Sequence, residues 1–440
     1  MRAIYLRQRF YLLCTIVCVV FALGLALPAF YFIGWIALFS LIAALAIDGL
    51  LVFREKNGIN AHRSVADRLS NGDENPIEVF IENRYSFPVK VNVIDEIPHQ
   101  FQRRDVGWDM DVSPGHQKIL KYALRPVKRG EYHFGALNVF ASTRIGLIER
   151  RFRFNIDHLV KVYPSYMQMR KYGFAAIHQK LQQFGLKRQR RLGHTMEFEQ
   201  IKEYVPGDDR RSINWKATGR RNTLMLNQFR DERSQQIFNV IDKGRLMRAP
   251  FEGLSLFDYA VNSSLVLSFI AINKHDKAGL ISFSHRMSSY VPAAKKRSQM
   301  KLIQDALYHQ RTKYLDANFE RLGVFISRQI RQRSLLLIYT NFESLSGLER
   351  QLPYLKALAK KHVVVAIFFQ NSGLQSLLNR KTTSLREVYH QTLAEKLLHE
   401  KQLIVKRLKQ SGIHAVLTRP QDLTVNTINK YLELKGKGVI

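Results

Sequence analysis

The sequence of 440 residues has little cysteine: Cys14 and Cys18 are its only two, and both lie in an apolar run near the beginning. The remaining chain has no disulfide bond to stabilise it, which suits a reducing compartment. The sequence also lacks a cluster of histidines or cysteines and a phosphate-binding loop of the G-x-x-x-x-G-K type. We therefore expect any ATP hydrolysis to come from a partner protein.

Acidic residues are the second deficit. Lys and Arg number 68 against 36 Asp and Glu, which gives a formal net charge of +32. Such an imbalance predicts an acidic partner, which could be nucleic acid, anionic lipid or an acidic protein face. The hydrophobic content of 46% is that of an ordinary globular protein with a buried core, so disorder is not expected.

Two long apolar runs lie near the beginning, Phe10–Leu27 and Ala29–Phe53, with only Pro28 between them. Each is long enough, or nearly so, to cross the roughly 30 Å hydrocarbon core as a helix. A cleaved signal peptide would have one such run, whereas here a second and longer run follows at once. The sequence therefore predicts a two-span transmembrane hairpin within residues 1–57, and one long span fused to a signal anchor is the alternative. Asp48 is expected at the interface or between the helices rather than in a proton relay.

Basic residues flank both runs and indicate their orientation. Three arginines precede the first run and two basic residues follow the second: Arg2, Arg7, Arg9, Arg54 and Lys56. By the positive-inside rule both ends of the hairpin face the cytoplasm, which predicts a multi-pass membrane protein with cytoplasmic soluble domains. A basic soluble part also gains roughly 1 kcal/mol per Lys or Arg near an anionic inner leaflet. A periplasmic soluble part is the alternative.

Three regions follow the hairpin. Residues 58–164 contain short alternating runs broken by turn formers, a pattern typical of an antiparallel β-sandwich of the immunoglobulin-like type. Residues 165–233 have no clear period and form a basic linker. From 234 to 435, strands that are apolar throughout alternate with helices, which predicts a doubly wound α/β domain with a parallel sheet.

The linker contains the stretch "EYVPGDDRRSINWKATGRRN", residues 203–222. Pro206 and Gly207 favour a turn. We expect Asp208 and Asp209 to form ion pairs with neighbouring arginines, and Trp215 to bury its ring. The stretch is thus predicted to be a structural clasp or a surface that docks a partner. Contact with phosphate or nucleic acid, and catalysis by the two carboxylates, are the alternatives.

This stretch resembles one bacterial family. The residues that lie at the family's spacing are Tyr204, Pro206, Gly207, Asp208, Arg211, Ile213, Trp215, Arg220 and Glu232. The chain is similar to members of the family called domain of unknown function 58, and the order of its regions matches over nearly the whole length. The resemblance implies a von Willebrand factor A-like domain, a partnership with AAA+ ATPases of the MoxR type, and a place in the bacterial inner membrane.

The same resemblance bears on metal binding. Domains of the von Willebrand A type hold a metal with an Asp-x-Ser-x-Ser motif after the first strand, a later Thr and a later Asp. Asp242 matches the first position, but Gly244 and Leu246 replace the serines, and Asn341 stands where the later Asp would be. Because a hard cation needs those oxygen ligands, no metal and no other cofactor is expected, and a divalent cation is the alternative.

These observations predict a membrane-anchored adaptor without enzymatic activity. By resemblance, it would serve a MoxR-type ATPase in the assembly or maintenance of envelope-associated complexes, with the anionic membrane surface as a second partner. Specific nucleic-acid binding is not expected, because no DNA-binding or RNA-binding motif accompanies the basic charge. The alternatives are a metal-dependent hydrolase that uses Asp208, Asp209 and Asp242, or a basic module that binds nucleic acid or anionic lipid.

Overall fold

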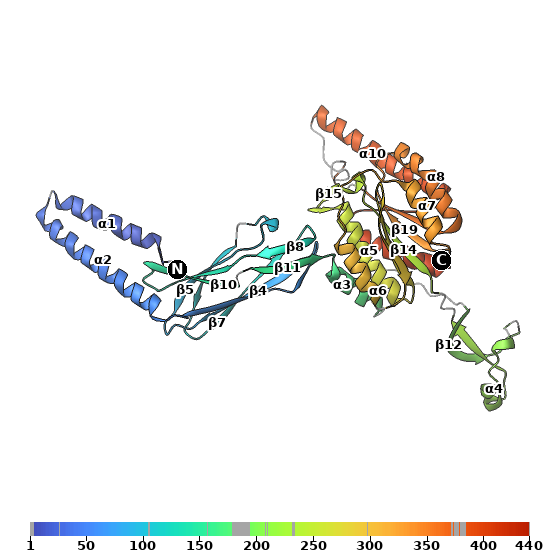
Figure 1. The fold of residues 1–440 in the computed structure, drawn as a ribbon, viewed down its shortest axis with the longest axis horizontal. Coiled ribbons are helices and arrows are strands. Elements are labelled where there is room, and N and C mark those ends of the chain that lie inside the picture. The colour runs from blue at the N-terminus through green and yellow to red at the C-terminus, as the bar shows by residue number, and fades with distance from the viewer. Residues whose placement is uncertain are drawn as a thin grey trace. The chain divides into compact units, whose positions relative to one another are not determined.

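The computed structural model describes residues 4–25, 27–103, 106–155, 157–177, 194–206, 208, 210–230, 234–296, 298–370, 373, 378 and 384–439. The chain divides into two compact units, Met1–Tyr163 and Pro164–Ile440 (Figure 1). Helices and several separate sheets occur, so the protein is of the mixed α/β class. The finer division of each unit into two regions stays a prediction.

The first unit begins with two apolar helices, α1 (Gln8–Gly24) and α2 (Pro28–Arg54), which we call the helix pair. Pro28 occupies the first turn of α2, where its missing N–H costs no helical hydrogen bond. Gly34 allows the Phe21 ring of α1 to come close, because a Cβ at this position would lie 2.8 Å from the ring. Helix α2 is long and apolar enough to cross a membrane by length and composition, and α1 is a shorter apolar helix.

Mainly antiparallel sheets make up the rest of the first unit. The strands are β1 (Ile4–Leu6), β2 (Ile59–Ser64), β3 (Arg68–Ser70), β4 (Asn75–Asn83), β5 (Val89–Asp95), β6 (Gly107–Val112), β7 (Gln117–Leu124), β8 (Gly130–Phe134), β9 (Leu137–Ser142), β10 (Ile148–Phe154) and β11 (His158–Tyr163). They form one five-stranded sheet, β1-β10-β9-β5-β6, and two three-stranded sheets, β2-β4-β7 and β3-β11-β8. Alternate residues of β4 and β5 are buried and share one core with β2 and β9, so two sheets face each other as the alternation predicted.

The second unit contains the family motif and a large sheet. Its elements are α3 (Tyr166–Ile177), β12 (His194–Glu203), α4 (Trp215–Arg221), β13 (Met225–Arg230), β14 (Gln236–Asp242), β15 (Pro250–Phe251), β16 (Leu254–Ser255), α5 (Leu256–Asn273), β17 (Lys277–Phe283), β18 (Met287–Ala294), α6 (Ser298–Tyr308), α7 (Phe319–Gln329), β19 (Leu335–Tyr339), α8 (Leu345–Lys361), β20 (Val363–Phe369), α10 (Leu385–Gln410), β21 (His414–Thr418) and α11 (Leu423–Lys437).

The large sheet has the strand order β18-β17-β14-β19-β20-β21. Five strands are parallel, and the edge strand β18 runs antiparallel to β17. Helices α5, α6 and α11 share a core with one face of the sheet, and α7, α8 and α10 pack on the other face (Figure 1). Helix α5 is apolar enough for a membrane, but most of it is buried in this core. Strand order reverses between β14 and β19, which is where a doubly wound sheet opens its crevice.

Candidate functional site

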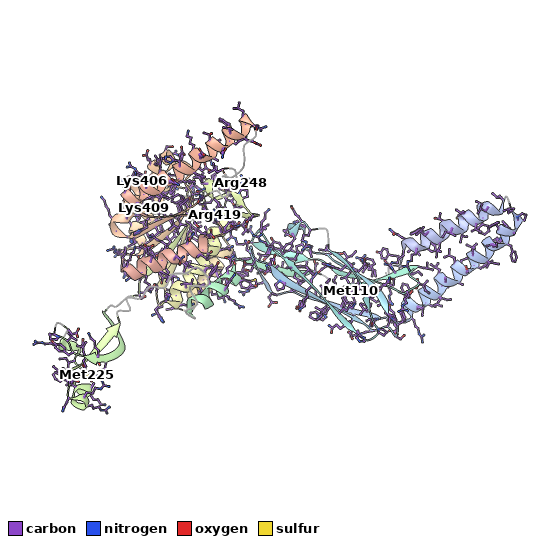
Figure 2. The ribbon with its side chains drawn as sticks, turned by 180° about the vertical axis from the view of Figure 1, so that it is seen from behind. Met110, Met225, Arg248, Lys406, Lys409 and Arg419 are labelled. Atoms are coloured by element: carbon purple, nitrogen blue, oxygen red, sulfur yellow. The ribbon has the colours of Figure 1, made fainter. Side chains whose placement is uncertain are left out.

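The first candidate site is the motif segment, residues 194–230. Its strands β12 and β13 pair with each other, and α4 lies between them in the sequence. Asn214 caps α4, since its side chain accepts a hydrogen bond from the Ala217 N–H at 3.0 Å. Its own N–H donates to the Met225 carbonyl at 2.8 Å, which ties the helix start to β13. Met225 is buried at that junction (Figure 2). Asn222 ends the helix in the left-handed region, at φ 54°. Local side-chain caps therefore shape the segment.

Asp208 has a structural partner within the same segment. The Lys202 ammonium lies 2.9 Å from its carboxylate, and the Val205 N–H donates to that carboxylate at 3.2 Å. The Asp208 N–H in turn donates to the Val205 carbonyl at 3.0 Å, which closes the predicted turn around Pro206. We expected Asp208 to pair with neighbouring arginines, and Lys202 at the end of β12 is a partner that this prediction did not include. These bonds fit a clasp better than a catalytic acid.

Trp215 corrects one prediction. Its side chain is 71% exposed, so the expected burial of the ring is wrong. The physical reason is the size of α4: a helix of seven residues with no buried residue offers nothing wide enough to cover an indole. Apolar and basic side chains are exposed in the same segment, namely Ile201, Val205, Leu224, Arg210, Lys216, Arg220 and Arg221.

The structure describes some of the remaining predicted motif residues and leaves others out. The N–H of Tyr204 donates to the Leu224 carbonyl at 2.8 Å and so joins the ends of β12 and β13. Arg211 lies in a short 3₁₀ turn, and the structure describes its backbone alone. Gly207, Asp209 and Glu232 lie outside the described residues.

The second candidate site lies at the carboxyl ends of β14 and β19, which we call the strand-end cluster. Asp242 is buried there, and both of its oxygens are used: Gly244 N–H donates to Oδ1 and Thr340 Oγ1 donates to Oδ2, each at 2.7 Å. Burial raises the pKa of Asp242 from 3.8 to about 6, against the effect of these two hydrogen bonds. The carboxylate is therefore satisfied by the protein itself.

Lys401 completes this cluster, a role that the sequence pattern did not predict. It reaches in from α10, where its ammonium donates to Asn341 Oδ1 at 2.9 Å and to the Phe342 carbonyl. Burial lowers the pKa of Lys401 to about 8, with Glu343 opposing the effect. The ammonium is a fixed cation on oxygens of the kind a metal would use. Among the described residues, no group of three or more His, Cys, Asp and Glu side chains could hold a metal ion.

The Asp242 environment gives a prediction with a definite sign. Because the folded-state pKa is raised, the stability that Asp242 contributes is full below about pH 3.8 and is lost as the pH rises through about 6. We expect Asp242→Asn to increase the free energy of unfolding at pH 7 by up to about 3 kcal/mol. An amide can still accept from Gly244 and donate to the Thr340 hydroxyl. Denaturant unfolding of both chains at pH 4 to 7.5 measures the difference.

Asp422→Asn is the matched control, since Asp422 is exposed and its side chain caps nothing at the start of α11. It should leave the pH profile of stability unchanged. A loss of stability in the Asp242→Asn chain at pH 7 would contradict the prediction, because it would show that the ionised carboxylate is needed there.

The helix pair, the facing sheets and the doubly wound unit together define a mixed α/β protein whose motif segment is capped and partly exposed. Residues 200–393 match the model of the family described as Protein of unknown function DUF58. The resemblance predicted from the motif is thus confirmed for this part of the chain. The Uncharacterized protein YeaD of Bacillus subtilis (strain 168) is 25% identical over 221 residues, which make up 48% of this chain and 54% of that protein. The chain therefore spans about half the length of this relative.

Solved structures give only weak likenesses. The CARDB domain of the PF1109 protein of Pyrococcus furiosus, solved with di-metal ions, is 16% identical at a TM-score of 0.17, over 24% of this chain and 86% of that one. The PapD-like domain 7 of human CEP192 is 10% identical at a TM-score of 0.18, over 24% of this chain and 87% of that one. Scores this low support no argument about fold or function.

Proposed function

We propose that the chain is a membrane-anchored interaction protein without enzymatic activity that docks a partner through its motif segment. The observation that carries the proposal is the 71% exposure of Trp215 among exposed basic residues. Interface hot spots are enriched in Trp and Arg, and an indole left in water gains much from burial by a partner. Trp215 with Arg220 and Arg221 fits a partner pocket that is apolar and rimmed by acidic residues.

The family resemblance supplies the class of partner, an AAA+ ATPase of the MoxR type. The sequence has no phosphate-binding loop of its own, so energy for remodelling would come from that partner. The chain would then act as an adaptor that recruits the ATPase to envelope-associated complexes. The structural role of Asp208 in its turn and the satisfied carboxylate of Asp242 favour this proposal over a hydrolase.

The helix pair would form the membrane anchor. Helix α2 has 27 residues, and at 1.5 Å per residue it is roughly 40 Å long, which exceeds the hydrocarbon thickness of roughly 30 Å. Basic residues lie before α1 and at the end of α2, which favours cytoplasmic ends in a bacterial inner membrane. Exposed cations elsewhere, such as Lys406 and Lys409 on α10 (Figure 2), suit an anionic membrane surface.

The doubly wound unit would be a von Willebrand A-like domain without a metal. The strand order, with an antiparallel edge strand beside the second parallel strand, supports the fold assignment. The ammonium of Lys401 on Asn341 supports the absence of a metal role, since a cation already occupies those oxygens. Partner binding in this unit would then need no bridging ion.

Trp215→Ala tests the docking surface. We expect crosslinking from native membranes to recover at least about tenfold less AAA+ ATPase with this variant, the loss typical of a hot-spot residue. Tyr389→Ala is the matched control, because Tyr389 is a similarly exposed aromatic of the same unit, at 67%. Equal recovery with all three chains, or no ATPase with any of them, would overturn the proposal.

A further inference from the structure

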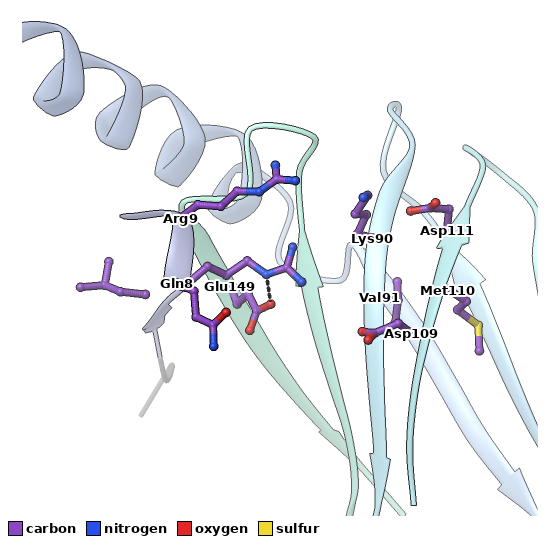
Figure 3. Close-up of a pocket in the computed structure, with 10 residues that line it drawn as sticks. Gln8, Arg9, Lys90, Val91, Asp109, Met110, Asp111 and Glu149 are labelled. Atoms are coloured by element: carbon purple, nitrogen blue, oxygen red, sulfur yellow. Dashed lines mark ion pairs between the residues drawn. The ribbon is translucent and has the colours of Figure 1, made fainter. Parts of the chain in front are cut away.

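A pocket lies where α1 meets the five-stranded sheet, with a cavity volume of about 620 Å³ (Figure 3). It is lined by three basic and three acidic side chains, Arg7, Arg9, Lys90, Asp109, Asp111 and Glu149. Arg7 and Glu149 form an ion pair at 2.5 Å and so satisfy each other. Arg9 donates through Nη1 to the carbonyls of Arg144 and Ile145, each at 3.4 Å, which leaves the other N–H groups of its guanidinium for a ligand. Lys90, Asp109 and Asp111 are the other charged residues that could receive one.

The charges of Lys90 and Asp111 are available. These residues lie directly opposite each other on β5 and β6, and Figure 3 shows both across the pocket from Arg9. Opposed charges on paired strands usually attract, yet within the described part of the chain neither side chain forms an ion pair. Asp109 accepts one hydrogen bond from Asn92 at 2.8 Å, which leaves its carboxylate further acceptor sites.

The pocket lies at the level where the helix pair would leave the bilayer. The N–H of Arg7 donates to the Leu147 carbonyl at 3.0 Å, and the Leu147 N–H donates to the Asp48 carboxylate of α2 at 2.8 Å. One residue of the turn between β9 and β10 therefore joins the start of α1 to α2. The stretch of α2 before Asp48, from Pro28 to Ile47, rises roughly 30 Å, which matches the hydrocarbon thickness. Asp48, Leu147 and the pocket then fall in the headgroup layer.

We propose that this pocket binds the headgroup of an aminophospholipid, with the phosphate on Arg9 and Lys90 and the primary ammonium on Asp109 and Asp111. The inference rests on the proposed membrane anchor. Arginine and lysine donate charge-assisted hydrogen bonds to phosphate oxygens, and a primary ammonium can donate to carboxylates. The glycerol of phosphatidylglycerol brings no positive charge to the carboxylates. The methylated ammonium of phosphatidylcholine cannot donate hydrogen bonds. The pocket therefore selects phosphatidylethanolamine among these lipids.

The test uses the full chain in nanodiscs with equal amounts of phosphatidylethanolamine, phosphatidylglycerol and phosphatidylcholine of one acyl composition, followed by native mass spectrometry of the retained lipid. We expect phosphatidylethanolamine to be retained about tenfold over either competitor, as for one charge-assisted hydrogen bond. Lys90→Gln should reduce retention of all three lipids. The double variant Asp109→Asn with Asp111→Asn should keep phospholipid binding and lose the preference over phosphatidylcholine.

Lys118→Gln is the matched control, because Lys118 is an exposed lysine of the first unit outside the pocket. Equal retention of the three lipids by the unaltered chain, or an unchanged preference in the Asp109 and Asp111 double variant, would overturn the headgroup site. Soluble glycerophosphoethanolamine that displaces the lipid as well as added lipid does would overturn the assignment to a membrane lipid. Release of the chain from membranes by alkaline carbonate would overturn both the membrane anchor and this headgroup site. A chain that stays in the membrane but shows no lipid preference would overturn the headgroup site alone.

Discussion

Replacing Asp48 by alanine should lower the free energy of unfolding of the first unit by about 3–5 kcal/mol and release the helix pair from the sheets. Asp48 has no exposed surface, although it belongs to an apolar helix. Its carboxylate accepts from the N–H groups of Leu147 and Ile148 at 2.8 and 2.9 Å, and from the Thr143 hydroxyl. Alanine would leave three buried donors without an acceptor, and each such loss costs about 1–3 kcal/mol.

The measurement is thermal unfolding in detergent, combined with hydrogen exchange of the backbone at residues 143–148. Ser40→Ala serves as the control, since Ser40 is an exposed α2 residue whose hydroxyl donates only to the Ala37 carbonyl of its own helix. Its effect should stay within about 0.5 kcal/mol. If Asp48→Ala unfolds like Ser40→Ala and its exchange at 143–148 does not rise, the carboxylate does not hold the two parts together.

Elements with a strong local pattern could be predicted from the sequence, and contacts between distant residues could not. The apolar runs near the beginning became α1 and α2, and the apolar strands became β14, β17, β19, β20 and β21. Edge strand β18 has no such signal, because its residues Met287–Ala294 are all at least partly exposed and include Pro292. An edge strand is covered on fewer sides, so its composition stays mixed.

The candidate sites show the same division. Asp242 and Asn341 could be placed together at the carboxyl ends of the strands, because Asp242 ends one apolar strand and Asn341 follows another. Lys401 lies 60 residues beyond Asn341 in a long polar helix, and nothing in its neighbourhood marks it as the lysine that turns inward. The wrong prediction that the Trp215 ring is buried has a related cause. Residue type predicts that an indole favours burial, but only the tertiary structure decides whether a covering surface exists.

Removal of one partner of a buried ion pair inside the first unit is the second change expected to cause a large loss of stability. Arg63 of β2 and Asp95 of β5 form an ion pair in which neither side chain has exposed surface. The Arg63 guanidinium also donates to the Gly135 carbonyl at 3.1 Å and lies 4.6 Å from the centre of the Phe134 ring, while the Tyr122 hydroxyl donates to Asp95. Removal of one partner of such a pair leaves an unpaired buried charge, so Arg63→Met should cost about 3–5 kcal/mol of unfolding free energy.

Asp95, the other partner of the ion pair, decides how much of the stability lost in Arg63→Met can be recovered. Burial already raises the pKa of Asp95 against the opposing effect of Arg63, so removal of Arg63 should raise that pKa further. The Arg63→Met loss should therefore shrink as the pH falls through the raised pKa, because the protonated carboxyl carries no charge. Adding Asp95→Asn removes the unpaired charge and keeps an acceptor for the Tyr122 hydroxyl, so the double variant should regain most of the stability at pH 7. Denaturant unfolding of the single and double variants across pH 5 to 8 measures both effects. A double variant as unstable as Arg63→Met would show that the loss comes from packing of the guanidinium on Phe134 and not from the buried charge of Asp95.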